Sequence, residues 1–151
     1  MRSIESLLAE YNASHGNRIN KVLHWICVPL IVISLLGLLW QLKMPLLPVQ
    51  VNGAEVLTGL AMIYYLILSP RLALGMLLVT ALMLTLLNYL ERSDVSLWRV
   101  AVVVFVIAWA GQFIGHHIEG KRPSFFKDIQ FLLIGPLWLL SFVYRKFNIT
   151  Y

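Results

Sequence analysis

Long runs of apolar residues alternate with short polar stretches along this chain, and the pattern predicts helices that cross a membrane. The first run carries no charge and has the length of about 20 residues that a spanning helix needs. Turn-forming or charged residues separate each run from the next. The predicted spanning helices cover residues 22–42, 54–69, 72–90 and 97–115, with a loop at 43–53.

The two ends of the chain show weaker apolar patterns. Within the N-terminal segment 1–21, apolar residues recur at helical spacing and predict a short amphipathic helix on the membrane surface. The apolar stretch 129–143 would be roughly 22 Å long as a helix, which is shorter than a hydrocarbon core of about 30 Å. We predict a partial, kinked or re-entrant element there, or a fifth crossing. The residues that carry the N-terminal pattern are Ile4, Leu7, Leu8 and Tyr11.

Composition supports a membrane protein and excludes several other classes. Of the 151 residues, 60% are hydrophobic and only 13% are charged, and the mean hydropathy is +0.80. Soluble domains carry roughly a quarter charged residues, so a soluble globular domain is excluded, as is a disordered chain. The single cysteine, Cys27, excludes an internal disulfide and a cysteine-cluster metal site. With no secretory signal, repeat or second domain visible, we predict an all-α polytopic membrane bundle over residues 1–151.

The basic residues predict the orientation of this bundle. The net charge is +5, but the bases stand singly or in small groups between apolar runs, which argues against a nucleic-acid partner. With four crossings and the N-terminus inside, nine bases lie inside and three outside, in the sense of the positive-inside rule. A fifth crossing would reduce the bias to seven against five, so we prefer four crossings and a partial fifth element. The inner bases are Arg2, Arg18, Lys21, Arg71, Lys121, Arg122, Lys127, Arg145 and Lys146, and the outer ones are Lys43, Arg92 and Arg99.

The four histidines lie in two places that this topology brings to one face. His15 and His24 stand at the start of the first spanning helix, and His116 and His117 stand at the end of the fourth. An even number of crossings separates the two places, so both emerge on the cytoplasmic face. Histidines about ninety positions apart in the sequence can therefore converge on one site.

Helical spacing adds other polar side chains to the same faces, because residues three and four positions apart are neighbours on a helix. If the two faces meet, imidazoles, carboxamides and a carboxylate line a pocket with an apolar membrane side. Imidazoles with one carboxylate suit iron, manganese or zinc, and open positions suit ferrous iron that activates oxygen. Asn20 or Gln112 would then fix the orientation of a metal-binding imidazole. The later face comprises Phe105, Trp109, Gln112, His116 and Glu119, and the earlier one Asn17, Asn20 and His24.

Simpler interpretations of these residues stay open. His117 points about 100° away from His116 on a helix and is left out of the site. Glu119 is alternatively a salt-bridge partner of Lys121 or Arg122, and these two bases either set the topology or hold a carboxylate headgroup. Four tryptophans near predicted helix ends, Trp25, Trp40, Trp98 and Trp138, are typical of an interfacial belt.

Other kinds of site find little support. No glycine-rich phosphate loop and no serine nucleophile elbow occur. The spans are nearly free of ionisable groups, which argues against a proton-coupled transporter. A site at the membrane surface is favoured.

The polar runs resemble the signatures of the membrane 2-hydroxy fatty acid dioxygenases, the family of phytosphingosine breakdown. The resemblance covers about residues 11–143, and it departs at Cys27, where the family often has Gly, and at Ser124, where it often has Ala; these departures suggest a bacterial-type branch. The matching runs are Tyr11...His15-x-Asn17-x-x-Asn20-x-x-x-His24-x-x-x-x-Pro29, Trp109-x-x-Gln112-Phe113-Ile114-Gly115-His116-x-x-Glu119-Gly120-Lys121-Arg122-Pro123, and Gly135-Pro136.

This resemblance implies a small integral membrane enzyme that uses Fe²⁺ and O₂ to shorten a 2-hydroxy fatty acid by one carbon, an α-oxidation. By position, His15, His24 and His116 match the iron-binding or catalytic histidines, and Glu119 is a further member of the site. The compact loops suggest a bacterial inner membrane, and a eukaryotic protein of this type would be expected in the endoplasmic reticulum.

The implied substrate fits the remaining polar and aromatic residues. A 2-hydroxy acid offers a hydroxyl and a carboxylate that can chelate a metal, and Lys121 or Arg122 could steer the carboxylate. Phe105 and Trp109 would line an apolar sleeve for the chain. Two other functions remain open: a non-catalytic membrane protein that binds lipid or scaffolds a partner, and another metal-dependent lipid enzyme such as a hydroxylase or desaturase.

Overall fold

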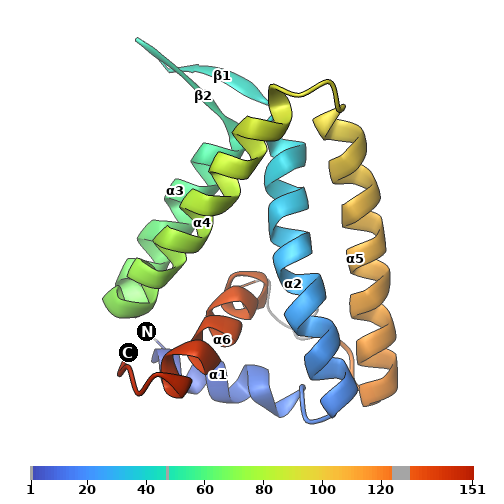
Figure 1. The fold of residues 1–151 in the computed structure, drawn as a ribbon. Helices are drawn as coiled ribbons and strands as arrows, with labels where there is room; N and C mark the ends of the chain where they lie inside the picture. The colour runs from blue at the N-terminus through green and yellow to red at the C-terminus, as the bar shows by residue number, and fades with distance from the viewer. Residues whose placement is uncertain (1, 47, 124–129) are drawn as a thin grey trace.

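A computed structural model describes residues 2–46, 48–123 and 130–151. Ser124, Lys127 and Ile129, which entered the predictions above, lie outside these residues. The described chain forms six α-helices and one antiparallel β-hairpin (Figure 1). In chain order the elements are α1 (Ile4–Ala13), α2 (Arg18–Leu39), β1 (Lys43–Leu46), β2 (Val49–Asn52), α3 (Gly53–Leu68), α4 (Pro70–Glu91), α5 (Leu97–Glu119) and α6 (Phe131–Lys146).

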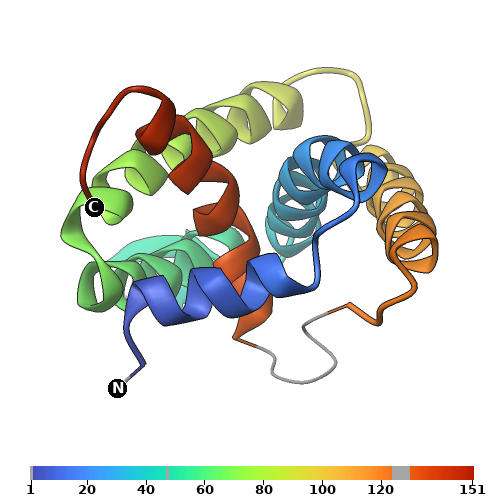
Figure 2. The ribbon, with the colours of Figure 1, turned by 90° about the horizontal axis from the view of Figure 1, so that it is seen from below.

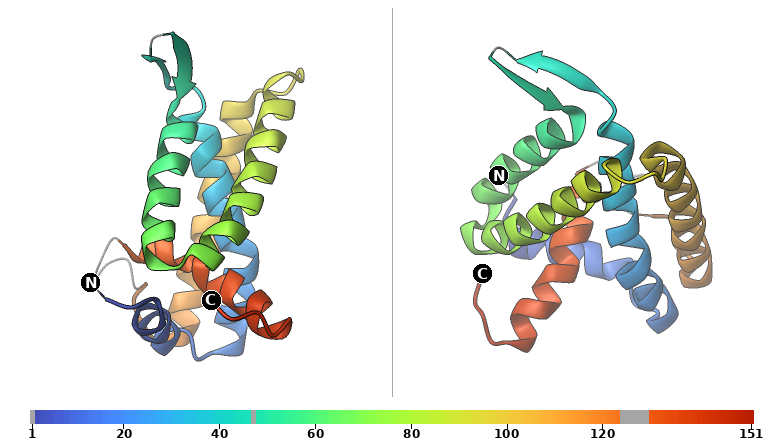
Figure 3. Two further views of the ribbon diagram at one scale, coloured as in Figure 1. Left: turned by 90° about the vertical axis from the view of Figure 1, so that its left-hand side faces the viewer. Right: turned by 45° about the horizontal axis from the view of Figure 1, so that its top comes forward.

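Four helices, α2 to α5, run in alternating directions and form two neighbouring pairs, α2 with α5 and α3 with α4 (Figure 1). At one end of the bundle, where α2 begins and α5 ends, α1 and α6 lie across the other helices (Figure 2). We call this the site end. The β-hairpin projects from the opposite end, which we call the hairpin end (Figure 3). Polar capping residues begin several helices, as Ser3 does for α1 and Asn17 for α2.

The helical prediction holds, and the number of long apolar helices is smaller than predicted. Among the described residues, α2, α4 and α5 are long and apolar enough to cross a membrane. The predicted span 54–69 corresponds to α3, which has only 16 residues and is about 24 Å long. The amphipathic helix predicted near the N-terminus is α1, and all four residues of its predicted apolar face are buried.

The predicted loop at 43–53 is wrong, because β1 and β2 form a hairpin there. Lys43 pairs with Asn52 and Pro45 with Gln50. Proline is tolerated in a strand that has a free edge, and this sheet has only two strands among the described residues. The alternation Val-Gln-Val-Asn over residues 49–52 was the available signal for a strand.

The pairing of α2 with α5 depends on small residues where the helices approach most closely. A Cβ atom at Gly111 would lie 2.6 Å from Sγ of Cys27, and one at Gly115 would lie 2.5 Å from Oδ1 of Asn20. Small residues let helix backbones approach in this way in membrane proteins. The close contact fixes the register of α2 against α5, and so the relative positions of His24 and His116.

Outward-facing residues of the bundle are largely apolar. Leu60 of α3, Leu82 of α4 and Ile107 of α5 are each more than 60% exposed, although water would solvate such side chains poorly. The buried residues form one cluster around α1, α3, α4 and α6 and a smaller one near the hairpin end. An apolar exterior of this kind suits a lipid surrounding.

Candidate metal centre

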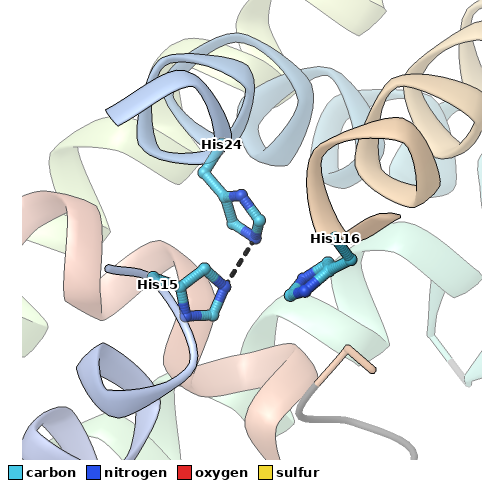
Figure 4. A group of neighbouring side chains, drawn as sticks. All are labelled: His15, His24 and His116. Carbon is cyan, nitrogen blue, oxygen red and sulfur yellow. Dashed lines mark hydrogen bonds between the residues drawn. The ribbon is translucent and has the colours of Figure 1, made fainter. Parts of the chain in front are cut away.

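Three imidazoles from different parts of the chain meet inside the site end (Figure 4). His15 comes from the turn between α1 and α2, His24 from the second turn of α2, and His116 from the last turn of α5. The side chains are 0%, 1% and 4% exposed. One nitrogen from each ring lies within 4.8 Å of the other two, and this is a group that could hold a metal ion.

Two of these rings are held by backbone carbonyls. Nδ1 of His15 lies 2.5 Å from the carbonyl oxygen of Tyr11, and Nδ1 of His24 lies 3.0 Å from that of Asn20. A carbonyl oxygen only accepts hydrogen bonds, so both Nδ1 atoms carry the proton and donate it. In the neutral rings both Nε2 atoms therefore present lone pairs.

These two lone pairs face each other, since the Nε2 atoms of His15 and His24 are only 2.9 Å apart (dashed in Figure 4). A hydrogen bond between them would require a second proton on one ring. Burial opposes that charge and lowers the pKa of His15 to about 4. A cation bound by both lone pairs would remove this repulsion. Two nitrogens bound to one ion at about 2.1 Å lie about 3 Å apart when they subtend a right angle at the ion.

His116 supplies the third nitrogen of the group. Its Nδ1 atom is buried without a hydrogen-bond partner among the described residues, and buried polar atoms without partners are uncommon. Its ring centroid lies 5.0 Å from that of His15 and 5.1 Å from that of His24. The donor set is three neutral imidazoles, which suits zinc, copper, iron or nickel.

Glu119 occupies a different place from the one predicted, because its carboxylate stands outside the imidazole group. Its oxygens accept hydrogen bonds from the backbone N–H groups of Gly16 and Asn17, both at 2.8 Å, and from the Asn20 amide at 3.2 Å. These groups lie at the N-terminus of α2, where unpaired N–H groups and the helix dipole attract a carboxylate. The expected metal ligand is thus a link between α5 and the turn that carries His15.

The two carboxamides that were predicted to orient an imidazole lie in different places. The Asn20 side chain donates to Glu119, and the atom that orients His24 is the Asn20 backbone oxygen. Gln112 is buried and lines a small cavity beside His24 and His116. Only Gln112 therefore lies where a side-chain amide faces the space next to the imidazoles.

The basic residues after α5 are exposed. Nζ of Lys121 donates to the backbone carbonyl of Ala13 at 2.6 Å, so this residue is bound to the end of α1. Arg122 lines an open hollow that also touches His116 and Phe113. His117 is exposed, as expected for the ring that points away from the site.

A cavity of about 50 Å³ adjoins the imidazoles on the interior side, with room for only a few water molecules. Trp109 lines it, whereas Phe105 does not and instead contacts Trp109 with ring centroids 6.0 Å apart. Apolar side chains from α2, α5 and α6 form most of its wall. The residues lining the cavity are Tyr11, His24, Val28, Ile31, Val32, Trp109, Gln112, His116, Phe131, Leu132 and Gly135.

Two aromatic residues of the site were not predicted. The Tyr11 ring stacks on His15 at 4.3 Å with an angle of 12° between the planes. Trp138 of α6, predicted in an interfacial belt, is 1% exposed, and its ring lies 5.1 Å from His15. The position of Tyr11 four residues before His15 was a usable signal, whereas the contact with Trp138 depends on how α6 folds back. Both rings exclude water from the imidazoles.

Comparisons with known proteins agree with one another. A family model described as 2-hydroxy-palmitic acid dioxygenase Mpo1-like matches residues 1–147. The curated protein 2-hydroxy-palmitic acid dioxygenase MPO1 of Saccharomyces cerevisiae is 29% identical over 140 residues, which cover 91% of this chain and 77% of the yeast protein. No solved structure matches the chain.

Proposed function

Because this chain belongs to the 2-hydroxy-palmitic acid dioxygenase Mpo1-like family, we propose that it is an iron-dependent dioxygenase that shortens 2-hydroxy fatty acids by one carbon. The family assignment confirms the resemblance found in the sequence. The observation that carries the proposal is the buried group of His15, His24 and His116, two of whose neutral Nε2 atoms face each other at 2.9 Å. Such a group suits a metal that is open on its remaining sides.

We assign the three histidines as ligands of Fe²⁺. When bound, the ion supplies the redox chemistry and a site where O₂ and a chelating 2-hydroxy acid come together. The carbonyls of Tyr11 and Asn20 keep the Nδ1 protons in place, so that the Nε2 lone pairs of His15 and His24 stay directed inward. The overall reaction balances as R–CH(OH)–COOH plus O₂ giving R–COOH, CO₂ and H₂O.

The small cavity is the proposed place for the reacting end of the substrate. Val28, Ile31 and Trp109 give it an apolar wall directly beside His24 and His116. At about 50 Å³ it takes the polar end and the first carbons, and the rest of the chain extends into lipid. Arg122, at the open hollow that shares His116, is the proposed partner for the carboxylate, in preference to Lys121.

The proposed orientation places the site end on the cytoplasmic side. The described bases at this end include Arg18, Arg71 and Arg145, whereas Lys43 and Arg92 lie at the hairpin end. In this arrangement α2, α4 and α5 cross the membrane, the shorter α3 is the fourth crossing, and α6 is the partial element. The membrane is a bacterial inner membrane, or the endoplasmic reticulum in a eukaryote.

The test is an assay of the purified protein in detergent with Fe²⁺, O₂ and 2-hydroxypalmitic acid. We expect pentadecanoic acid and CO₂ as products, and no turnover without O₂ or with 3-hydroxypalmitic acid, which presents its hydroxyl one carbon further away. A product of unchanged chain length would point to a hydroxylase or desaturase. Absence of both bound metal and turnover would leave a lipid-binding or scaffold protein.

A further inference from the structure

Hydrogen bonds link the end of α5 to the turn between α1 and α2. We propose that Glu119 and Lys121 are positioning residues that hold His15 at the distance from His116 at which both can bind one ion. This inference rests on the proposed metal site. In this role, neither residue contacts the ion or the substrate.

The three histidines differ in how their backbones are held. His24 and His116 belong to α2 and α5, whose register is fixed by the close packing at Gly111 and Gly115. His15 stands on a short turn between α1 and α2, and its carbonyl contact with Tyr11 is local. A separate contact must therefore fix the turn relative to α5.

Glu119 makes that contact from one helical turn beyond His116. Its carboxylate accepts from the N–H groups of the two residues that follow His15, Gly16 and Asn17. A Cβ atom at Gly16 would lie 3.3 Å from the carboxylate, so a residue without a side chain allows this approach. Glu119 and His116 are three positions apart on one helix face. A movement of this end of α5 therefore moves both residues together.

Lys121 holds the other side of the same turn. Its ammonium group donates to the carbonyl of Ala13, the last residue of α1, at 2.6 Å. Ala13, before His15, supplies a carbonyl acceptor, and Gly16 and Asn17, after it, supply N–H donors. All three are thus bound by one short segment, Glu119 to Lys121. Two contacts on opposite sides restrict both translation and rotation of the turn.

The experiment measures metal affinity in Glu119→Gln, with Glu55→Gln as the matched control. Glu55 also accepts a hydrogen bond from a backbone N–H at a helix N-terminus, that of Asn52 at 2.9 Å, but at the hairpin end. Titration of the purified proteins with Co²⁺, followed by visible absorption, reports both affinity and ligand geometry. We expect Glu119→Gln to weaken binding about 10–100-fold and to change the spectrum, as substitutions of ligand-supporting groups do, while Glu55→Gln changes affinity less than about twofold.

Two further variants keep the test decisive if Glu119→Gln does not fold. Glu119→Asp keeps the charge with a shorter side chain, and we expect it to recover part of the lost affinity. Lys121→Met removes only the contact with Ala13, and we expect a loss of a few fold. Unchanged affinity in the Glu119 variants, or an equal loss in Glu55→Gln, would overturn the positioning role while His24→Ala still showed that the site binds metal. If the wild-type protein bound no metal, the proposed function itself would fail.

Discussion

The two ends of the bundle use the same chemistry over very different distances in the chain. At the hairpin end, Glu55 and its N-cap Asn52 form a capping box three residues apart at the start of α3. At the site end, Glu119 accepts from N–H groups at the start of α2 that lie 103 and 102 residues away. The carboxylate at the hairpin end is therefore held by a local contact, whereas the carboxylate at the site end is held only when distant helices have come together.

The largest expected effect concerns the imidazoles themselves. In His24→Ala or His116→Ala, one of the three proposed ligands is lost, so we expect bound iron to fall below about a tenth of the wild-type content and turnover to fall more than about 100-fold. Metal analysis and product formation measure both. The control is His117→Ala, which removes an exposed imidazole beside His116 and should keep its iron; an equal loss there would refute the assignment of His116.

The next effect compares how much one tryptophan at each end of the bundle contributes to stability. Trp138→Ala removes a ring that is 1% exposed at the site end, and we expect it to lower the free energy of unfolding by about 3–5 kcal/mol. Trp98→Ala removes one that is 54% exposed near the hairpin end and should change it by about 0.5 kcal/mol or less. Unfolding titrations in mixed micelles give both values. Similar losses in the two variants would show that Trp138 is not a core residue.

A smaller effect tests the contact of α2 with α5. Gly115→Ala places a methyl group 2.5 Å from Asn20 Oδ1, so we expect a loss of about 1–3 kcal/mol and weaker metal binding. Gly59→Ala in α3 meets no atom of the described chain within 4 Å and should stabilise its helix by up to about 1 kcal/mol. The same unfolding titrations compare the pair, and a stable Gly115→Ala protein with normal affinity would argue against this register.

The smallest predicted effect is one of pH on the metal-free protein. Burial lowers the pKa of His15 from 6.5 to about 4, so between these values the unfolded chain binds the extra proton and the folded one does not. Stability is thus complete above pH 6.5 and decreases as the pH falls toward 4. His15 alone contributes about 1 kcal/mol to this loss at pH 5.5 relative to pH 7.5. At this pH, hydrogen exchange should show faster opening in α1 than in α3. Equal opening of the two helices would contradict the assignment of the lost stability to His15.

The parts of the fold that follow from local pattern could be predicted from the sequence. Apolar runs gave the helices, and the spacing of Ile4, Leu7, Leu8 and Tyr11 gave the buried face of α1. The convergence of His15, His24 and His116 followed from topology alone, because an even number of antiparallel helices returns the chain to the same end. Each of these arguments needs only the sequence and the periodicity of a helix.

The parts that depend on long-range contact could not be predicted. Glu119 was predicted to join the metal site because it shares a helix face with His116 and because of the family resemblance, and no pattern in the sequence indicates that its partners are the N–H groups of Gly16 and Asn17. Trp138 was predicted to lie in an interfacial belt with the exposed Trp98, but it stands in the middle of α6, and only the folding of α6 across the bundle buries it. The hairpin at 43–52 was missed because Pro45 and Pro48 favour a loop when a free strand edge is not considered.

The separation of the three imidazoles along the chain also bears on how the protein is made. His15 and His24 are synthesised first, and His116 follows 92 positions after His24. A chain that emerges from the ribosome one residue at a time therefore offers at most two of the three nitrogens until the last long helix has been inserted. At the proposed metal site, complete chelation would therefore be a late event of biogenesis, and a chain truncated before α5 would lack the third imidazole.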